Sequence, residues 1–555
     1  MANKGFYHNK IIYVSPTGDY KGNGSLELPL DIYTAVENVI EGQTIVLLEG
    51  TYLLHKAVKI QRGMDGTAEA PIKMIADPAA KTRPVLDFQG LSAGIVHGGD
   101  YWYFYGFDVT RSADMQKGFQ VSGNYNTLDN INTYYNGNTG IQISRLSGQD
   151  LFADWPAYNL ILNCTSYCNY DSGFEDADGF AAKLTVGEGN VFDGCIAFNN
   201  ADDGWDLYAK VETGSIGAVT IKNCVAYANG FIPGMNKADG TPMTGNGNGF
   251  KLGGSSLSGK HQLINSYAFF NLAKGIDSNS CPDIIVTNCT SYNNGSYNVA
   301  FYTNAGANTD FKANGIISFK DDTLTKYVPV GGDVTKGEQL KGKGTQVSAD
   351  YINETTYYWD GSVCKNSADK ALTADIFVSL DFTGITRNED GTINMNGFLE
   401  LKENAPEAGA RPDGTASSDN STLPEGDGHV FSDAWVTLDN QYHWHECECG
   451  FTTDRGEHEY VYVVDMQPTP TSSGWKHREC TICGKKGPKI EMYYDEIAPD
   501  TPDTPDEPDT PNEPDTPDEP DTPDAPQELT IFGKIVKAIV DFFVNLIDKI
   551  KGFFS

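Results

Sequence analysis

One seven-residue stretch, Asn163-Cys-Thr-Ser-Tyr-Cys-Asn169, recurs along the middle of the chain. Each copy has a small or apolar second residue, an aromatic fifth residue and a closing asparagine. The six copies are Asn130–Asn136, Asn163–Asn169, Gly194–Asn200, Asn223–Asn229, Asn265–Asn271 and Asn288–Asn294. Successive copies start 23 to 42 residues apart, so the chain accepts insertions between them. Self-similarity at such a period is the signature of a repeat architecture.

The repeat predicts an all-β chain folded as a parallel β-helix. Alternating apolar residues within each copy indicate a short strand with one buried face. Stacked coils bury such faces against one another. We expect the closing asparagines to form a ladder of side-chain hydrogen bonds, and the fifth-position aromatic side chains to stack inside the helix. A repetitive β-sandwich is disfavoured, because no hairpin dipeptides separate the copies.

The remaining sequence divides the chain into further segments. We expect the β-helix in residues 1–402, with a capping helix at 31–40, then a linker at 403–426. A small Cys/His-rich domain at 427–492, an acidic Pro-rich spacer at 493–527 and an amphipathic helix at 528–555 follow. The broad Phe/Ile face of that last helix suits attachment to a membrane interface or a partner helix.

Composition limits the location and partners of the protein. The net charge is −35, and residues 495–528 hold 14 acidic residues and no basic one, which excludes a nucleic-acid partner. No apolar stretch of 18 residues occurs, so no membrane-spanning helix is expected. Residues 1–5 lack an apolar signal core and read as a start from which an export signal has been removed. We expect a monomer that is secreted or attached to the cell surface.

Single cysteines are scattered through the repeat region among apolar residues. This placement indicates buried thiols rather than a disulfide framework. They are Cys164, Cys168, Cys195, Cys224, Cys281, Cys289 and Cys364.

An acidic cluster follows the third copy of the repeat and the coil before it. Asp202, Asp203 and Asp206 lie in one coil, and Asp178 occupies the equivalent place one coil earlier. Adjacent coils stack about 4.8 Å apart, so we expect these carboxylates to converge. A hard, oxygen-ligated cation such as Ca²⁺ fits such a cluster. The alternative is a solvated acidic turn, because Asp and Gly are ordinary turn residues.

One lysine stands among glycines a coil further on. Lys251 belongs to Gly245-Asn-Gly-Asn-Gly-Phe-Lys251, and Gly179-Phe-Ala-Ala-Lys183 echoes this segment, so both lysines are expected on similar strands. Isolated lysines are commonly solvated surface charges. Beside a metal ion, however, the pKa of a lysine falls, and its neutral amine can act as a base.

Three segments together resemble polysaccharide lyase family 9, which contains pectate lyases and some rhamnogalacturonan lyases. They are Ala177-Asp178-Gly-Phe-Ala-Ala-Lys-Leu-Thr-Val-Gly187, Asn199-Asn-Ala-Asp-Asp-Gly-Trp-Asp206 and Gly247-Asn-Gly-Phe-Lys-Leu-Gly-Gly254, and the resemblance covers roughly residues 9–402. It implies a right-handed parallel β-helix and calcium-dependent β-elimination of a pectic polysaccharide, either homogalacturonan or rhamnogalacturonan I.

The resemblance also implies roles for individual residues. The catalytic calcium would be bound by Asp178, Asp202, Asp203 and Asp206. Lys251 would be the base that removes the C5 proton of a uronate. On flanking coils, Lys183 and Lys274 are candidates for binding substrate carboxylates.

Two other classes of function remain as alternatives. A hydrolase on this scaffold would use paired carboxylates, but the Gly-His-Gly and Arg-Ile-Lys segments of β-helical polygalacturonases are absent from the sequence. A non-catalytic surface glycan-binding β-helix would need aromatic side chains along a groove, and no lysine beside a metal.

Residues 427–492 hold a second candidate metal site. Tetrahedral Zn²⁺ would be bound by Cys447, Cys449, Cys480 and Cys483, with His443, His445, His458 or His477 as alternative ligands. The competing interpretation is a pair of disulfides in an exported protein. The segment is similar to Cys/His repeats in surface proteins of Gram-positive anaerobes, which implies attachment.

Overall fold

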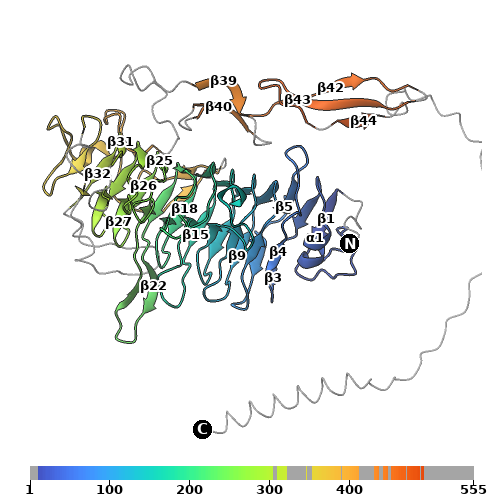
Figure 1. The fold of residues 1–555 in the computed structure, drawn as a ribbon, viewed down its shortest axis with the longest axis horizontal. Helices are drawn as coiled ribbons and strands as arrows, with labels where there is room; N and C mark the ends of the chain where they lie inside the picture. The colour runs from blue at the N-terminus through green and yellow to red at the C-terminus, as the bar shows by residue number, and fades with distance from the viewer. Residues whose placement is uncertain are drawn as a thin grey trace, which may run out of the picture. The chain divides into compact units, whose positions relative to one another are not determined.

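The computed structural model describes residues 10–303, 309–321, 345–346, 353–388, 391–411, 431–436, 442–447, 452–469, 472–487 and 489–492. Within these residues, three long parallel sheets of 11, 10 and 10 strands form the faces of a right-handed β-helix. Strands of successive coils lie side by side through the helix (Figure 1). The predicted fold class is confirmed.

Each sheet takes one strand from each coil, so its strands are far apart in sequence. Sheet A consists of β1 (Ile11–Val14), β2 (Thr44–Leu47), β5 (Ile72–Ala76), β8 (Trp102–Tyr105), β11 (Thr127–Asp129), β14 (Leu160–Leu162), β17 (Asn190–Asp193), β20 (Val219–Lys222), β25 (Gln262–Ile264), β28 (Ile285–Thr287) and β31 (Lys312–Asn314). Sheet B consists of β3 (Thr51–Leu53), β6 (Val85–Asp87), β9 (Asp108–Thr110), β12 (Asn132–Tyr134), β15 (Thr165–Tyr167), β18 (Ile196–Phe198), β21 (Val225–Tyr227), β26 (Tyr267–Phe269), β29 (Thr290–Tyr292) and β32 (Ile317–Phe319). Sheet C consists of β4 (Val58–Ile60), β7 (Ile95–His97), β10 (Phe119–Val121), β13 (Ile141–Ile143), β16 (Phe180–Ala182), β19 (Trp205–Asp206), β24 (Phe250–Lys251), β27 (Lys274–Asp277), β30 (Tyr297–Ala300) and β33 (Thr345–Gln346).

The repeat copies supply six consecutive strands of sheet B, and their closing asparagines form the expected ladder. From Asn136 to Asn294, each side-chain amide donates to the side-chain oxygen of the next asparagine at 2.9–3.0 Å. These side chains are buried, so each amide satisfies polar groups that water cannot reach. The ladder therefore fixes the turn between sheets B and C.

The fifth-position aromatic side chains stack as expected, but outside the helix. Neighbouring rings of this row lie 4.9–5.1 Å apart, from Tyr134 to Phe269. The interior positions of the same strands carry small side chains such as Thr133, Ser166 and Ala197. The expectation of an aromatic interior at this row was wrong, because alternation along a strand places the residue before the aromatic inside.

The first residue of each copy explains the preference for asparagine there. The φ angles of Asn130, Asn163, Asn223, Asn265 and Asn288 lie between 45° and 54°. Asparagine and glycine adopt this left-handed conformation most readily. Gly194, with φ of 63°, takes the position in the remaining copy.

Other elements cover one end of the β-helix and the outer face of sheet B. The predicted capping helix is α1 (Ile32–Asn38), whose N-terminus is capped by Asp31 and whose Ile32, Ala35 and Val36 are buried in the core. Residues 353–388 and 391–411 pack on the outer aromatic row of sheet B, where Phe382 and Phe398 contact Phe269.

The β-helical unit extends further than the expected boundary at residue 402. Ala410 donates its backbone N–H to Thr290 Oγ1 at 2.9 Å, and Arg411 donates to Asn265 Oδ1 at 2.7 Å. Residues 403–411 are therefore part of the fold rather than of a linker. The sequence did not predict this role, because the segment is short and polar and the strands it contacts lie more than a hundred residues away.

Smaller elements complete the described chain. They are the hairpin β22 (Phe231–Asn236) and β23 (Pro242–Thr244), the 3-10 turns η1 (Phe152–Asp154) and η3 (Ala374–Ile376), and the pairs and triplets β34 (Tyr358–Trp359), β35 (Cys364–Lys365), β36 (Ala371–Leu372), β37 (Thr386–Arg387) and β38 (Ile393–Asn394). The described residues between 431 and 492 form two antiparallel sheets, with strands β39 (Phe431–Val436), β40 (Tyr442–Cys447), β41 (Thr452–Glu457), β42 (Tyr460–Met466), β43 (Gly474–Cys480) and β44 (Ile490–Met492).

The expected buried thiols are present. All seven cysteines of the β-helical unit are free of disulfides; six of them are buried, and Cys168 is half-buried. Among the described residues, no helix is long and apolar enough to cross a membrane. The predicted spacer at 493–527 and amphipathic helix at 528–555 lie outside the described residues.

Candidate active site

A four-residue pattern recurs in four consecutive coils of sheet C. Its copies are Asp178-Gly-Phe-Ala181, Asp203-Gly-Trp-Asp206, Asn248-Gly-Phe-Lys251 and Lys274-Gly-Ile-Asp277. The parallel register pairs Ala181 with Asp206, Asp206 with Lys251 and Lys251 with Asp277. The first and last residues of the pattern therefore form two neighbouring polar columns.

The middle residues of the pattern hold these columns in place. Phe180, Trp205 and Phe250 stack inside the helix, with ring centroids 4.7 and 4.9 Å apart. A Cβ atom on Gly204 would lie 2.9 Å from the ladder amide of Asn229, so the glycine lets the two columns pass close to the asparagine ladder. Core packing and the ladder thus position the polar side chains.

Three carboxylates converge at the centre of the two columns. Oxygen atoms of Asp178, Asp203 and Asp206 lie within 4.8 Å of one another, and all three side chains are buried. Asp202 is buried beside them, but it is not part of this group, and its Oδ1 accepts the backbone N–H of Asn246 at 3.0 Å. The stacking of Asp178 against the next coil is as expected.

Two lysines compensate this cluster. Lys251 Nζ lies 3.0 Å from Asp203 Oδ2 and 3.4 Å from Asp206 Oδ1. Lys183 Nζ lies 2.6 Å from Asp178 Oδ2 and 3.0 Å from Asp206 Oδ2. When all three carboxyl groups are ionised, the two ammonium groups leave one negative charge uncompensated. Oxygen donors with excess negative charge are the ligand set that Ca²⁺ prefers, so these residues fit a bound calcium ion.

Burial shifts the pKa values of these carboxyl groups apart. Burial, opposed by Lys183, raises the pKa of Asp178 to about 7. Burial, together with the charge of Asp203, raises the pKa of Asp202 to about 10. For Asp206, burial acts in the same direction, but Lys251 and Lys183 outweigh it and its pKa lies below the usual range.

Both lysines are stabilised as cations in the described geometry. Burial disfavours the ammonium form of Lys251, but Asp203 and Asp206 outweigh it and raise its pKa. The pKa of Lys183 is raised in the same way by Asp178 and Asp206. The expected lowering of the Lys251 pKa therefore requires that the charge of its carboxylate partners be neutralised.

Several polar groups that hold the cluster were not among the site residues predicted from the sequence. Asn248 donates both its backbone N–H and its side-chain amide to Asp203 Oδ1, at 2.7 and 2.8 Å. Thr139 donates to Asp178 Oδ2 at 3.1 Å, and the backbone N–H of Tyr208 donates to Asp206 Oδ1 at 3.1 Å. Register alone would have revealed Asn248, since it precedes the glycine of the pattern.

The last copy of the pattern carries a separate ion pair. Lys274 Nζ lies 2.7 Å from Asp277 Oδ2 and 3.4 Å from Tyr302 Oη. Its side chain is 24% exposed, compared with 16% for Lys251 and 12% for Lys183. Of the two lysines expected to bind substrate carboxylates, Lys274 is therefore the more accessible, whereas Lys183 is already paired inside the cluster.

The candidate zinc site is only partly described. Cys480 and Cys483 lie close together, and His458 lies beside them as a third side chain that could bind a metal. Asp465 and Glu479 engage the two ring nitrogens of His477 at 2.8 and 3.0 Å. The side chains of Cys447, His443 and His445 lie outside the described residues, as does all of Cys449.

Comparison with known proteins places this site in a family. Residues 12–313 match the model described as "Pel9A-like, right handed beta helix region". A pectate lyase L from Thermoclostridium stercorarium is 42% identical over 66% of this chain and 28% of its own length. A pectate lyase L from Paenibacillus polymyxa is 38% identical over 70% of this chain and 81% of its own length.

Solved structures agree with this match. The crystal structure of pectate lyase Pel9A superposes with a TM-score of 0.53 at 31% identity, covering 71% of this chain and 90% of that one. A rhamnogalacturonan lyase reaches the same TM-score at 22% identity, over 71% of this chain and 97% of that one, which shows a shared fold. The matched region covers more than half of the chain and contains all the residues of the acidic cluster. The chain is therefore an enzyme of polysaccharide lyase family 9.

Proposed function

We propose that the chain is a calcium-dependent pectate lyase that cleaves pectic polyuronate by β-elimination. The observation that carries the proposal is the position of Lys251, whose amine lies 3.0 Å from a carboxylate of the buried Asp178–Asp203–Asp206 cluster. Support also comes from relatives named pectate lyase that are 38 and 42% identical to this chain.

The cluster would bind the calcium ion. Asp178, Asp203 and Asp206 supply oxygen atoms from two adjacent coils, and Asp202 is the neighbouring carboxylate that the family resemblance adds. When bound, Ca²⁺ neutralises the charge of its Asp ligands and stabilises the negative charge that develops on the uronate carboxylate during elimination.

Lys251 is the proposed base. In the described geometry Asp203 and Asp206 keep it protonated. Once their charge is neutralised, the amine loses its proton, because its stabilising partners no longer favour the ammonium form. Lys251 then takes the C5 proton of the uronate, the electron pair forms the C4–C5 double bond, and the C4 oxygen leaves with the other chain fragment.

A polymeric substrate would contact more than one lysine of sheet C, and it also indicates where the enzyme acts. A chain laid along sheet C from β19 towards β27 would pass Lys251 and then Lys274, whose partly exposed amine is suited to a second uronate carboxylate. A polysaccharide of this kind lies outside the cell, so we propose that the enzyme acts as a secreted or surface-attached protein.

The test is an assay that distinguishes elimination from hydrolysis. The purified chain is given polygalacturonate or rhamnogalacturonan I, in calcium and in excess chelator. Near-ultraviolet absorbance reports the unsaturated product, and new reducing ends are counted in parallel. We expect absorbance and reducing ends to rise together on polygalacturonate, to stop with chelator and to return with added calcium.

Each other result would replace the proposal with a specific alternative. Product from rhamnogalacturonan I alone would make the chain a rhamnogalacturonan I lyase on the same scaffold. New reducing ends without absorbance would indicate hydrolysis. Binding of polymer with no cleavage would indicate a non-catalytic glycan-binding β-helix.

A further inference from the structure

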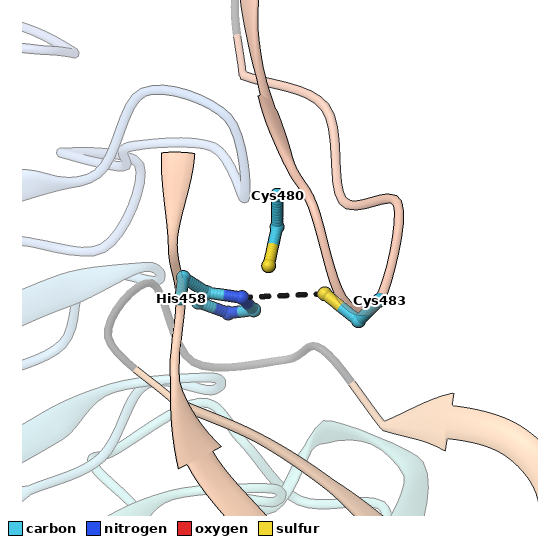
Figure 2. Close-up of side chains that lie close together, drawn as sticks. All are labelled: His458, Cys480 and Cys483. Atoms are coloured by element: carbon cyan, nitrogen blue, oxygen red, sulfur yellow. Dashed lines mark hydrogen bonds between the residues drawn. The ribbon is translucent and has the colours of Figure 1, made fainter. Parts of the chain in front are cut away.

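The sheet β42–β43–β44 brings one imidazole and two thiols together outside the β-helix. His458 precedes strand β42, Cys480 ends strand β43, and Cys483 lies in the turn that follows (Figure 2). Their ligand atoms all lie within 4.8 Å of one another, and Cys483 Sγ is 3.3 Å from His458 Nδ1. The cluster thus connects the beginning of one strand to the end of its neighbour.

We propose that His458, Cys480 and Cys483 bind one zinc ion that stabilises the β42–β43–β44 sheet. Thiolate sulfur and imidazole nitrogen are the ligands that Zn²⁺ prefers, whereas Ca²⁺ takes oxygen. A tetrahedral zinc site has four ligands, and the described residues supply three. Cys480 and Cys483 belong to the four-cysteine set expected from the sequence, and His458 is one of the alternative ligands expected there.

The exposure of apolar side chains in this sheet gives an independent reason for a stabilising metal. Val461, Tyr462, Val464 and Met466 of strand β42 are 43 to 61% exposed. Folded units below about 40 residues rarely bury enough apolar surface and commonly depend on metals or disulfides. Few of the described apolar side chains of residues 458–492 are buried, so a zinc ion would supply stability that apolar burial does not.

The surroundings of the cluster limit which side chains can bind the metal. Cys480 is buried at 2% exposure, and Cys483 is half-buried. His477, the other described histidine of the sheet, is held by Asp465 and Glu479 and leaves His458 as the imidazole ligand.

The test uses the full chain, with zinc sulfate as the probe and excess calcium present to occupy oxygen sites. Zinc per chain is measured by elemental analysis after dialysis for the natural sequence, Cys480→Ser, Cys483→Ser and His458→Gln. Each of these variants should lose one zinc equivalent per chain. The matched control is Cys168→Ser, which removes a half-buried thiol from the β-helical unit and should keep the full zinc content.

A second measurement uses the unaltered chain and does not depend on how the variants fold. Zinc should protect Cys480 and Cys483 from alkylation, read by mass spectrometry. Unchanged zinc content in all three variants would overturn the proposal. Alkylation of both thiols at the same rate with and without zinc would also overturn it. So would a Cys480–Cys483 disulfide that forms again after reduction even when zinc is present.

Discussion

The register of strand β24 determines which charged side chains surround Lys251. It is paired with Asp206 on one side and Asp277 on the other, and its amine lies 3.0 Å from Asp203 Oδ2. A shift of one residue along strand β24 would turn this side chain into the core. The interior packing of Phe250 against Trp205 therefore determines where the amine lies.

Replacing Lys251 with methionine tests its role as the base. General-base catalysis typically contributes about 10²- to 10⁴-fold, so we expect kcat for the unsaturated product to fall by about 10³-fold or more. Polymer binding, measured by affinity electrophoresis, should change little. The matched control is Lys59→Met on strand β4 of the same sheet, which should keep full activity. Substantial residual turnover in the Lys251 variant would remove this residue as the base.

Asp203→Asn tests the metal site while preserving side-chain shape. The substitution removes one of three converging carboxylates. A charge-assisted interaction contributes about 1.5–3 kcal/mol, so calcium affinity should fall roughly 10- to 100-fold in calorimetric titration. Asp108→Asn, which removes a carboxylate paired with Arg83 on sheet B, should leave the affinity unchanged. Equal affinities in both variants would contradict the assignment of the cluster.

A buried histidine predicts how stability depends on pH. His97 lies inside the helix against Phe104 and Trp102, and burial lowers its pKa to about 4. Above pH 6.5 the ring is neutral in both folded and unfolded states. As the pH falls from 6.5 to 4, the unfolded chain takes up a proton that the folded chain does not, and stability is lost at up to about 1.4 kcal/mol per pH unit.

His97→Leu measures this contribution. Ile60 and Val121 flank the position on neighbouring strands, so an aliphatic side chain suits it. The difference in unfolding free energy between the variant and the natural chain should shift in favour of the variant between pH 6.5 and pH 4. At pH 8 the same difference reports packing alone. A difference that does not vary with pH would show that His97 is protonated equally in both states.

The site residues were predictable to the extent that they repeat. Asp178, Asp203, Asp206 and Lys251 stand in a pattern that the coil spacing brings into register, so sequence reasoning placed them together. Lys183 was expected to face substrate. In the structure its amine is paired with Asp178. Sequence reasoning missed this contact, because the turn that directs the amine towards the acidic cluster has no sequence pattern of its own.

Among elements, the asparagine ladder is the clearest link from sequence to fold. Asn229 accepts from the backbone N–H and the amide of Asn200, and it donates to Asn271 and to the Ala197 carbonyl. Removing the Asn229 side chain breaks all four of these hydrogen bonds and leaves the buried backbone N–H of Asn200 without its acceptor.

Asn229→Ala should therefore reduce the free energy of unfolding by at least about 1–3 kcal/mol. Asn23→Ala, in an exposed turn, should change it by no more than about 0.5 kcal/mol. Denaturant unfolding followed by tryptophan fluorescence gives both values. A ladder variant as stable as the turn variant would show that the amides are exchanged for water without loss.

The aromatic row shows where element prediction fails. The rings recur in every copy, as a core would require, yet they lie outside sheet B and contact residues such as Phe382 and Phe398. A pattern of period two identifies two faces but does not say which of them a distant segment covers. The packing of residues 403–411 was missed because a sequence pattern does not show which distant strands a segment contacts.

At the scale of the whole molecule, the two proposed metal sites differ in their chemistry. The β-helix offers buried carboxylates to a hard cation, and the β42–β43–β44 sheet offers thiols and an imidazole to a softer one. The first site follows from stacked coils and was foreseen. The second was foreseen only as a set of candidate ligands, because antiparallel pairing of β42 with β43, rather than sequence spacing, brings His458 to Cys480.

The central claim is that the Lys251 site breaks its polymer by elimination, without adding water. The most direct test is to digest polygalacturonate with the calcium-loaded chain in water labelled with heavy oxygen and to weigh the fragments by mass spectrometry. At times short compared with the exchange of reducing-end oxygen with water, we predict fragments with unsaturated ends, lighter by one water than hydrolysis products and free of the heavy isotope. Fragments that all have the mass of hydrolysis products and carry heavy oxygen at the new reducing ends from the earliest times would contradict the account.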